Sequence, residues 1–492
     1  MKNILIIYVE RIVQVVVGLL ISYFVINYFT SNEYGIYKYI MSIVNIFVIF
    51  ILLGFNIANV RYIPEYLINN TYSKINYQIL VFTTIQIFIL GISLLLFWYF
   101  YTNEYFKLNN NIEIIYLLLL VILNYMKSYF AESLLVAFSK RILLTYIRIV
   151  LYIIQFVIIY ISIMQEVNIK EFIEYIVFYS FIETFILVIT MLKVYKEEIS
   201  TFHIKKFNLS KPYAVAINNY GFSIVNFFRD NAITIVVVSY LFDYTEVAYY
   251  SVALIIPNMI RSFTPSKIFA GLLIPEFVAQ YNKTKKDLDI FNGINFISKI
   301  NLIFLIPAII YSVFLYQFII ENYFSLDYAN NTNLLAIILF INILFLSYLD
   351  LNILLSNILE KSHLVLKINI LSISNILFLF LFHSFGRYSI GISNLISTFF
   401  TVIVFWFVLR NIYNMKIEFN FFNKNILFYS VILLISSFLI FNINIYLYMI
   451  LFPIIVVVGW LILVKTTFFL DFEKEFIFNK LIKNKKLRGY YE

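Results

Sequence analysis

Long apolar runs with few charges recur along this chain of 492 residues, and they restrict what it can fold into. A helix needs about 20 apolar residues to cross the roughly 30 Å hydrocarbon core of a bilayer. The runs are continuous and lack the alternation of barrel strands, so we expect transmembrane helices. Fourteen spans are predicted, at approximately residues 4–28, 37–60, 77–101, 112–138, 143–164, 169–194, 213–241, 247–275, 292–320, 333–359, 362–384, 388–413, 425–443 and 446–470.

The composition supports a lipid environment. The chain is 62% hydrophobic and 13% charged, and its mean hydropathy is +0.90. A soluble domain carries about 25% charged residues and could not bury this much apolar surface. Soluble enzymes, nucleic-acid binders and secreted proteins are therefore excluded. Glu10 and Arg11 interrupt the first run and no small-residue cleavage site follows, so we expect a retained span there and not a signal peptide.

Basic residues are distributed unevenly between the two sets of loops. One alternate set, with the basic C-terminal segment, holds 25 of the 36 Lys and Arg residues. The opposite set holds only four: Lys38, Lys107, Lys170 and Arg387. Cytoplasmic loops are enriched in Lys and Arg, so both termini are predicted to be cytoplasmic. The net charge of +9 then reflects topology and contact with anionic lipid headgroups, and no nucleic-acid partner is expected.

Residues that commonly bind metals are scarce. The chain has no cysteine, which excludes disulfides, thiolate metal sites and iron–sulfur clusters. Its three histidines, His203, His363 and His383, are too far apart in sequence to form a local metal motif. We therefore expect neither a metal site nor a cofactor.

An internal repeat links two distant parts of the chain. Residues Glu33–Tyr37 are followed by Ile63–Tyr66, which contains Pro-Glu, and Glu246–Tyr250 are followed by a second Pro-Glu segment, Ile274–Phe277. The Glu-to-Pro distance is 31 residues in the first copy and 29 in the second. Six predicted spans separate equivalent points, and an even number makes the repeats parallel. The pattern predicts two six-helix lobes related by a pseudo-two-fold axis along the membrane normal.

The repeat and the loop lengths predict the domain boundaries. The longest cytoplasmic connection falls between the sixth and seventh spans, and two further spans follow the second lobe. The expected parts are an N-lobe (1–194), a cytoplasmic linker (195–212), a C-lobe (213–414), two additional spans (415–470) and a basic cytoplasmic tail (471–492).

Two segments resemble a known family. LLGFNIANVRYIPEY (Leu52–Tyr66) is similar to the end of the second span in polysaccharide-biosynthesis flippases. RDNAITIVVVSYLFDYTEVAYYSVA (Arg229–Ala253) resembles the Asp-led seventh span and the following E-x-G-x-Y-type loop of that family, with Ala248 replacing the usual glycine. The motifs cover about a tenth of the chain; span number, orientation and repeat extend the likeness. The chain thus resembles the Wzx-like branch of the MOP exporter superfamily.

This resemblance implies a fold and a function. The fold would be all-α, with the two six-helix lobes of the MOP fold and two extra C-terminal helices. The substrate would be an undecaprenyl-pyrophosphate-linked oligosaccharide, moved across the bacterial cytoplasmic membrane by alternating access for O-antigen or capsule assembly. Polysaccharide polymerase machinery would be a partner alongside membrane lipids. No covalent chemistry is involved, so the protein would not be an enzyme.

Seven cations fall inside the predicted spans, where each costs about 2.5–3.5 kcal/mol if it faces lipid at the bilayer centre. Three of them, Arg11, Arg148 and Lys299, lie close enough to the cytoplasmic end to snorkel. The deeper ones should face a bundle interior or an aqueous cavity. These are Lys127, Arg229, Arg261 and Lys267.

The excess of deep cations indicates an anionic ligand. The planar fork of arginine suits pyrophosphate oxygens, so Arg229 and Arg261 are the first candidates and Arg11 the third. Lys127 and Lys267 complete the predicted substrate cavity. The alternative is that these cations only form interhelical ion pairs with the acidic residues of the spans.

Three carboxylates are candidate coupling-ion or proton sites: Asp230, Glu183 and Asp350. Adjacent residues of a helix do not share a face, so Asp230 is not expected to neutralise Arg229. Their spacing does not distinguish proton from cation coupling.

Two other functions stay open at this point. A MATE-type exporter coupled to a cation gradient would need only twelve spans, and its cavity is usually less cationic. A membrane enzyme, such as a polymerase or a lipid-dependent glycosyltransferase, would need a long outer loop or an acidic catalytic motif. The outer loops are about a dozen residues or fewer, which disfavours an enzyme.

Overall fold

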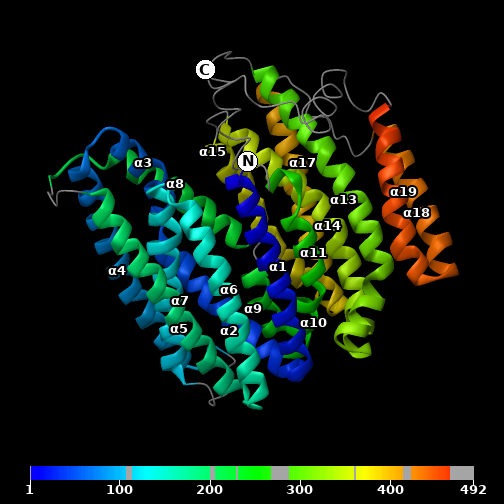
Figure 1. Ribbon diagram of the computed structural model, residues 1–492, viewed down its shortest axis with the longest axis horizontal. Helices are drawn as coiled ribbons and strands as arrows, with labels where there is room; N and C mark the ends of the chain where they lie inside the picture. The colour runs from blue at the N-terminus through cyan, green and yellow to red at the C-terminus, as the bar shows by residue number, and fades with distance from the viewer. Residues whose placement is uncertain are drawn as a thin grey trace. The chain divides into compact units, whose positions relative to one another are not determined.

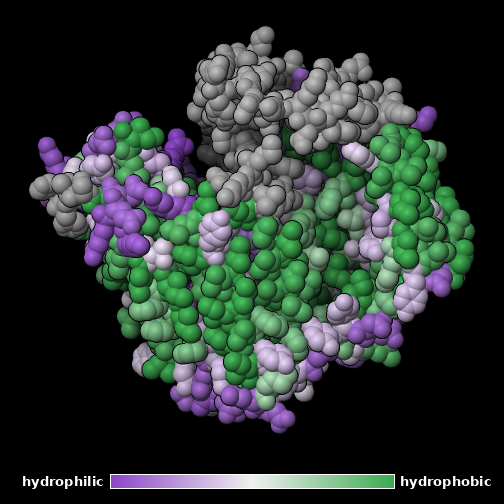
Figure 2. Space-filling model, in the orientation of Figure 1, coloured by the Kyte–Doolittle hydropathy of each residue, from purple (hydrophilic) through white to green (hydrophobic). Residues whose placement is uncertain are grey.

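The computed structural model describes residues 2–106, 113–199, 205–228, 231–267, 287–358, 362–413 and 423–465 (Figure 1). Within these ranges the chain is helical and contains no strand. Twelve helices are long and apolar enough to cross a membrane. Side chains along these helices are largely apolar on the surface, and hydrophilic groups gather toward the helix ends (Figure 2). The all-α, multi-pass membrane architecture expected from the apolar runs is confirmed.

The chain divides into two compact units. The first comprises residues 1–252 and 372–390, and in it α1 packs on α6, α2 on α9, and α7 on both α5 and the π-helix η1. Its helices are α1 (Lys2–Tyr28), α2 (Ser31–Leu52), α3 (Phe55–Ile68), α4 (Tyr72–Thr102), α5 (Ile114–Met126), η1 (Lys127–Leu135), α6 (Arg141–Met164), α7 (Ile169–Glu198), α8 (Ser210–Phe227), α9 (Asn231–Leu241), α10 (Tyr244–Ala253), α16 (Ser374–Leu381) and the short η3 (His383–Phe385).

The second unit comprises residues 253–371 and 391–492. The α13–α14 hairpin forms its main helix packing, and α18 packs on α19 and on α13. Its helices are α11 (Ile255–Ser262), α13 (Asp287–Tyr323), α14 (Leu326–Ile358), α15 (Ser362–Asn369), the short η2 (Ile370–Ile373), α17 (Tyr388–Tyr413), α18 (Lys424–Ile443) and α19 (Ile445–Lys465), of which η2 and α17 extend past the boundary.

Twelve of the fourteen expected spans overlap the twelve long helices of the described residues. The second span, expected at 37–60, instead runs over Ser31–Leu52, and the residues after Gly54 begin the separate helix α3. The other two, 213–241 and 247–275, are divided into shorter helices within the described residues. The first consists of α8 and α9, and residues 229–230 lie outside the described ranges. The second consists of α10, α11 and a further turn from Pro265, and residues 268–286 lie outside the described ranges. A count of fourteen spans therefore stays a prediction, as do the lobe boundaries.

The first half of each repeat copy begins a helix. In the first copy Thr30 and Glu33 form a capping box at the start of α2, in which each side chain accepts a hydrogen bond from the other residue's backbone N–H. In the second copy Asp243 accepts from the backbone N–H of Glu246 at 2.8 Å. The repeated Glu therefore occupies the same position, three residues after an N-cap. The second Pro-Glu segment, Ile274–Phe277, lies outside the described residues.

Glu246 makes a further contact that Glu33 does not share. Its carboxylate forms a 2.8 Å ion pair with Arg387, whose guanidinium also lies 4.7 Å from the centre of the Tyr249 ring. Burial raises the pKa of the Glu246 carboxyl, and the nearby Arg387 guanidinium partly opposes that rise. These contacts join α10 to the segment just before α17.

Two glycines in the first unit permit close backbone contacts. A Cβ on Gly35 would overlap the carbonyl oxygen of Tyr244, so the start of α2 can approach α10 only without a side chain there. Gly54 connects α2 to α3 with a φ of +71°, and its Cβ position is filled by the Ala216 carbonyl of α8. At Gly54 both the backbone conformation and the space exclude other residues.

Candidate anion site in the second unit

The predicted site residues fall into three groups in the structure. Arg229 and Asp230 lie outside the described residues. Arg11 lies on the exposed face of α1, where its guanidinium donates to Gln14 at 3.0 Å. The remaining candidates form two separate ion-pair clusters, one in each unit. Within the described ranges no three His, Asp or Glu side chains converge as a metal site.

The cluster in the first unit contains equal numbers of opposite charges. Lys127 lies at the start of η1 and forms a 2.8 Å ion pair with Glu183 on α7. The Tyr179 hydroxyl, one turn earlier on α7, is hydrogen-bonded to the same carboxylate. Only 7% of the Glu183 side chain is exposed. The Lys127 side chain, 31% exposed, thus neutralises a buried carboxylate.

A second balanced pair lies between α1 and α6. The Glu10 carboxylate accepts from the Thr145 hydroxyl at 2.9 Å and from the Arg148 guanidinium at 3.3 Å. Arg148 was expected to snorkel on its own, and the structure instead pairs it with the buried Glu10. Lys299, also expected to snorkel, is buried in α13. The sequence identified these charges but not their partners.

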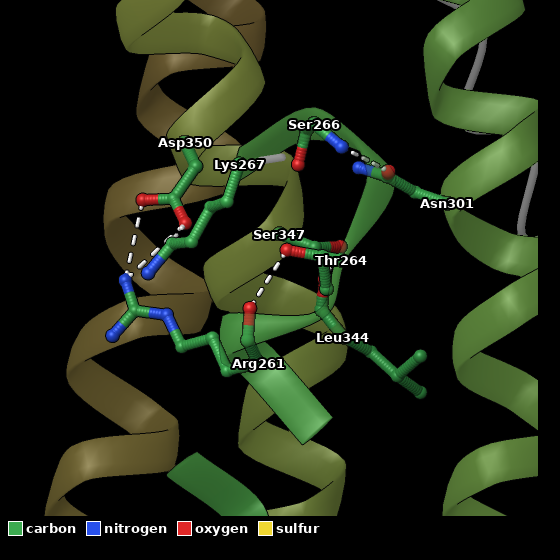
Figure 3. Close-up of polar contacts among 8 residues, drawn as sticks. All are labelled: Arg261, Thr264, Ser266, Lys267, Asn301, Leu344, Ser347 and Asp350. Carbon is green, nitrogen blue, oxygen red and sulfur yellow. Dashed lines mark hydrogen bonds and ion pairs between the residues drawn. The ribbon is translucent and has the colours of Figure 1, made fainter. Parts of the chain in front are cut away.

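The cluster in the second unit brings two cations to the same carboxylate. Arg261 and Lys267 both point toward Asp350 (Figure 3). One guanidinium nitrogen of Arg261 lies 3.2 and 3.3 Å from the two Asp350 oxygens, and the Lys267 ammonium lies 3.8 Å from one of them. Within the described part of the chain, two cations thus share the Asp350 carboxylate. We call these three residues the cationic cluster.

A break in the helical chain places the two cations on one carboxylate. Arg261 is in the last turn of α11, which ends before Thr264-Pro265 because a residue preceding proline disfavours the α conformation. The Thr264 hydroxyl donates to the Arg261 carbonyl at 2.8 Å and covers the helix end. The next turn starts at Pro265 and brings Lys267 back toward Asp350 on α14.

Asn301 of α13 holds the start of this second turn. Its side-chain oxygen accepts from the backbone N–H of Ser266 at 2.9 Å (Figure 3). Asn301 is buried, and it was not among the residues that sequence reasoning selected. Its only signal in the sequence is a polar side chain within an apolar run.

The cationic cluster has unused capacity for an anion. Its ion pairs are longer than the roughly 2.7–2.9 Å of strong charge-assisted hydrogen bonds. Arg261 contacts Asp350 through one nitrogen, and its buried Nε has no hydrogen-bond partner. The side chains of Arg261, Lys267 and Asp350 are 26%, 39% and 23% exposed, so the cluster is accessible. An anion with several oxygens could bind guanidinium donors that Asp350 leaves unused.

Comparison with solved structures identifies the fold. No protein-family profile and no curated protein sequence matches the chain. The lipid II flippase MurJ in an inward closed conformation is similar with a TM-score of 0.68 and 15% identity, over 94% of this chain and 100% of MurJ. A mutant of the MATE transporter VcmN from Vibrio cholerae is similar with a TM-score of 0.53 and 13% identity, over 85% of this chain and 96% of VcmN. MurJ and the MATE transporters are members of the MOP superfamily, and this chain has the fold that they share.

Proposed function

We propose that this chain is a flippase that moves an undecaprenyl-pyrophosphate-linked oligosaccharide across the bacterial cytoplasmic membrane. The observation that carries the proposal is the cationic cluster, where Arg261 and Lys267 both lie against Asp350 within an apolar protein. The fold shared with MurJ, a lipid II flippase, supports a lipid-linked substrate. The likeness of Leu52–Tyr66 to polysaccharide-biosynthesis flippases supports an oligosaccharide for O-antigen or capsule assembly, with polymerase machinery as a partner.

In the proposed mechanism the pyrophosphate binds Arg261 and Lys267, and the glycan enters the cavity while the lipid tail stays in the bilayer. Alternating access between the two lobes then carries the headgroup outward. The termini and the basic loops are cytoplasmic in this scheme. A membrane potential that is negative inside favours outward movement of an anion by about 2.3 kcal/mol per charge per 100 mV. Arg229 and Arg11 are the other proposed cations of this path, and Glu183 and Asp230 are proposed coupling sites.

The test uses purified protein in liposomes with a fluorescent undecaprenyl-pyrophosphate oligosaccharide, whose exposure on each leaflet is read with an added glycosidase. We expect Arg261→Ala to weaken substrate affinity about 10- to 100-fold, because a hydrogen bond to a charged group contributes about 1.5–3 kcal/mol. Lys267→Ala should weaken it less, because an ammonium acts as a point charge, whereas a guanidinium can bind two phosphate oxygens in parallel.

Lys170→Ala is the matched control. Lys170 lies at the start of α7 in the first unit and forms an exposed ion pair with Glu113. Normal flipping by both cluster variants at normal protein levels would refute the assigned site. Liposomes that instead accumulate small organic cations under a sodium or proton gradient, without flipping the lipid, would favour the MATE-type alternative.

A further inference from the structure

The cationic cluster already contains an anion that belongs to the protein. Asp350 occupies the position between Arg261 and Lys267 that a phosphate oxygen would take (Figure 3). The carboxylate is tethered to α14, so no ligand can reach both cations fully without competing with it. Our proposed function requires a pyrophosphate to bind here, and the following inference rests on that function.

The contacts of Asp350 are those of a displaceable group. Its distances of 3.2–3.8 Å to the two cations are longer than the 2.8 Å between Lys127 and Glu183. Its side chain is 23% exposed, whereas that of Glu183 is 7% exposed. Breaking a buried ion pair leaves an uncompensated buried charge, so release of the partly exposed Asp350 carboxylate should cost less than release of Glu183 from Lys127.

A bilayer presents the cluster with an abundant competitor. Phospholipids such as phosphatidylglycerol carry one negative charge and are present in large excess over any lipid-linked oligosaccharide. An uncompensated Arg–Lys pair would attract their headgroups. A pyrophosphate brings more charge, and its Coulomb attraction to the same cations is correspondingly larger.

We propose that Asp350 is an internal competitor that keeps phospholipid headgroups out of the cationic cluster. When a resident group occupies a site, the apparent affinity of every ligand equals its intrinsic affinity multiplied by the fraction of time that the site is unoccupied. The weak monoanion then no longer fills the cluster at its bilayer concentration, whereas the stronger pyrophosphate still does. Asp350 itself does not contact the substrate. It acts by determining which lipids can occupy the site.

Asp350→Asn tests this inference. Binding of undecaprenyl pyrophosphate and of phosphatidylglycerol is measured separately by native mass spectrometry of the purified protein. We expect the variant to bind both lipids about tenfold more tightly, by a similar factor, because the same competitor is removed for each. In liposomes, flipping by the variant should fall several-fold when phosphatidylglycerol is added to phosphatidylcholine, while wild-type flipping should not change.

Two controls separate this role from a structural one. Asp327→Asn makes the same chemical change on the first turn of α14, where Asp327 accepts from Asn331, and should leave both affinities at the wild-type value. Asp350→Glu keeps the charge and should keep the wild-type insensitivity to phosphatidylglycerol. If Asp350→Asn does not fold, Asp350→Ser serves as the neutral variant in the same measurements.

The outcomes distinguish the two proposals. Unchanged or weaker binding of both lipids by a folded neutral variant would overturn the role of Asp350. A wild-type protein that binds no undecaprenyl pyrophosphate would instead contradict the proposed function.

Discussion

Gly35 and the ion pairs between helices show how single residues determine which helices can pack together. Gly35 permits contact between α2 and Tyr244. Lys127 and Glu183 neutralise each other between η1 and α7. In the cationic cluster the same residue types are arranged differently. Arg261 shares the Asp350 carboxylate with Lys267, and its buried Nε has no hydrogen-bond partner. Whether a membrane-embedded cation is structural or available to a ligand thus depends on its local charge balance.

We expect Gly35→Ala to destabilise the protein by about 1–3 kcal/mol, as overpacking of a tight contact usually does. Thermal unfolding in detergent measures the change. Gly91→Ala on α4 is the matched control, because a Cβ there meets nothing within 4 Å. That control should be neutral or more stable by up to about 1 kcal/mol, since alanine favours helix over glycine. Equal melting of the two variants would contradict the close contact.

Removing Lys127 should cost about 3 kcal/mol, because the Glu183 carboxylate is left buried without its partner, and removing Glu183 should cost less, because Lys127 is partly exposed. We expect Lys127→Met and Glu183→Gln each to destabilise, and the double variant to lose less than their sum by at least about 1 kcal/mol. The exposed Lys170–Glu113 pair gives the comparison and should couple by about 0–1 kcal/mol. Additive losses at Lys127 and Glu183 would argue against a structural pair.

A break in the helical chain lies at the candidate site. Most helices in the described parts of the chain run long enough to cross a membrane, but α11 ends after Ser262 and a new turn starts at Pro265. The break frees backbone groups that a continuous helix would satisfy, and Thr264 and Asn301 provide replacement contacts. Unwound segments inside transporters are tolerated where they line a cavity. The interruption therefore supports a functional role for this segment.

Asn301→Ala should raise the KM for the lipid-linked substrate several-fold with little change in kcat, since Lys267 loses its support through Ser266. Losing a buried hydrogen-bond acceptor costs about 1–3 kcal/mol, part of which should appear as lower stability. Asn322→Ala, on the same helix α13 with only a contact to the Phe318 carbonyl, is the control. A variant that loses stability with an unchanged KM would limit Asn301 to a structural role.

The orientation of the protein in the membrane is predicted from the distribution of Lys and Arg among the loops, and this prediction is directly testable. The absence of cysteine means that single cysteines can be introduced without altering other residues. Asn69 and Asn103 flank α4 on opposite ends. We expect Asn69→Cys to react with a membrane-impermeant maleimide only after the cells are opened, and Asn103→Cys to react in intact cells. The reverse pattern would overturn the predicted cytoplasmic termini.

The apolar runs anticipated most of the fold because hydropathy is local. Twelve helices appear where runs of about 20 apolar residues occur, since no other regular structure except a closed barrel satisfies its backbone in lipid. Pro257 and Pro265 predict a kink in the span that contains Arg261. The end of α11 at Ser262 is not predicted, because apolar composition continues through it.

Sequence alone determined the membrane class, the helical structure and the set of charges that needed partners. Only the tertiary structure decided which charges meet: Asp350 lies 89 residues after Arg261, yet their side chains are in contact. Such pairing depends on how each helix is rotated about its axis and on which helix packs beside it. Neither quantity is encoded in a local pattern, because both emerge from the simultaneous packing of distant segments.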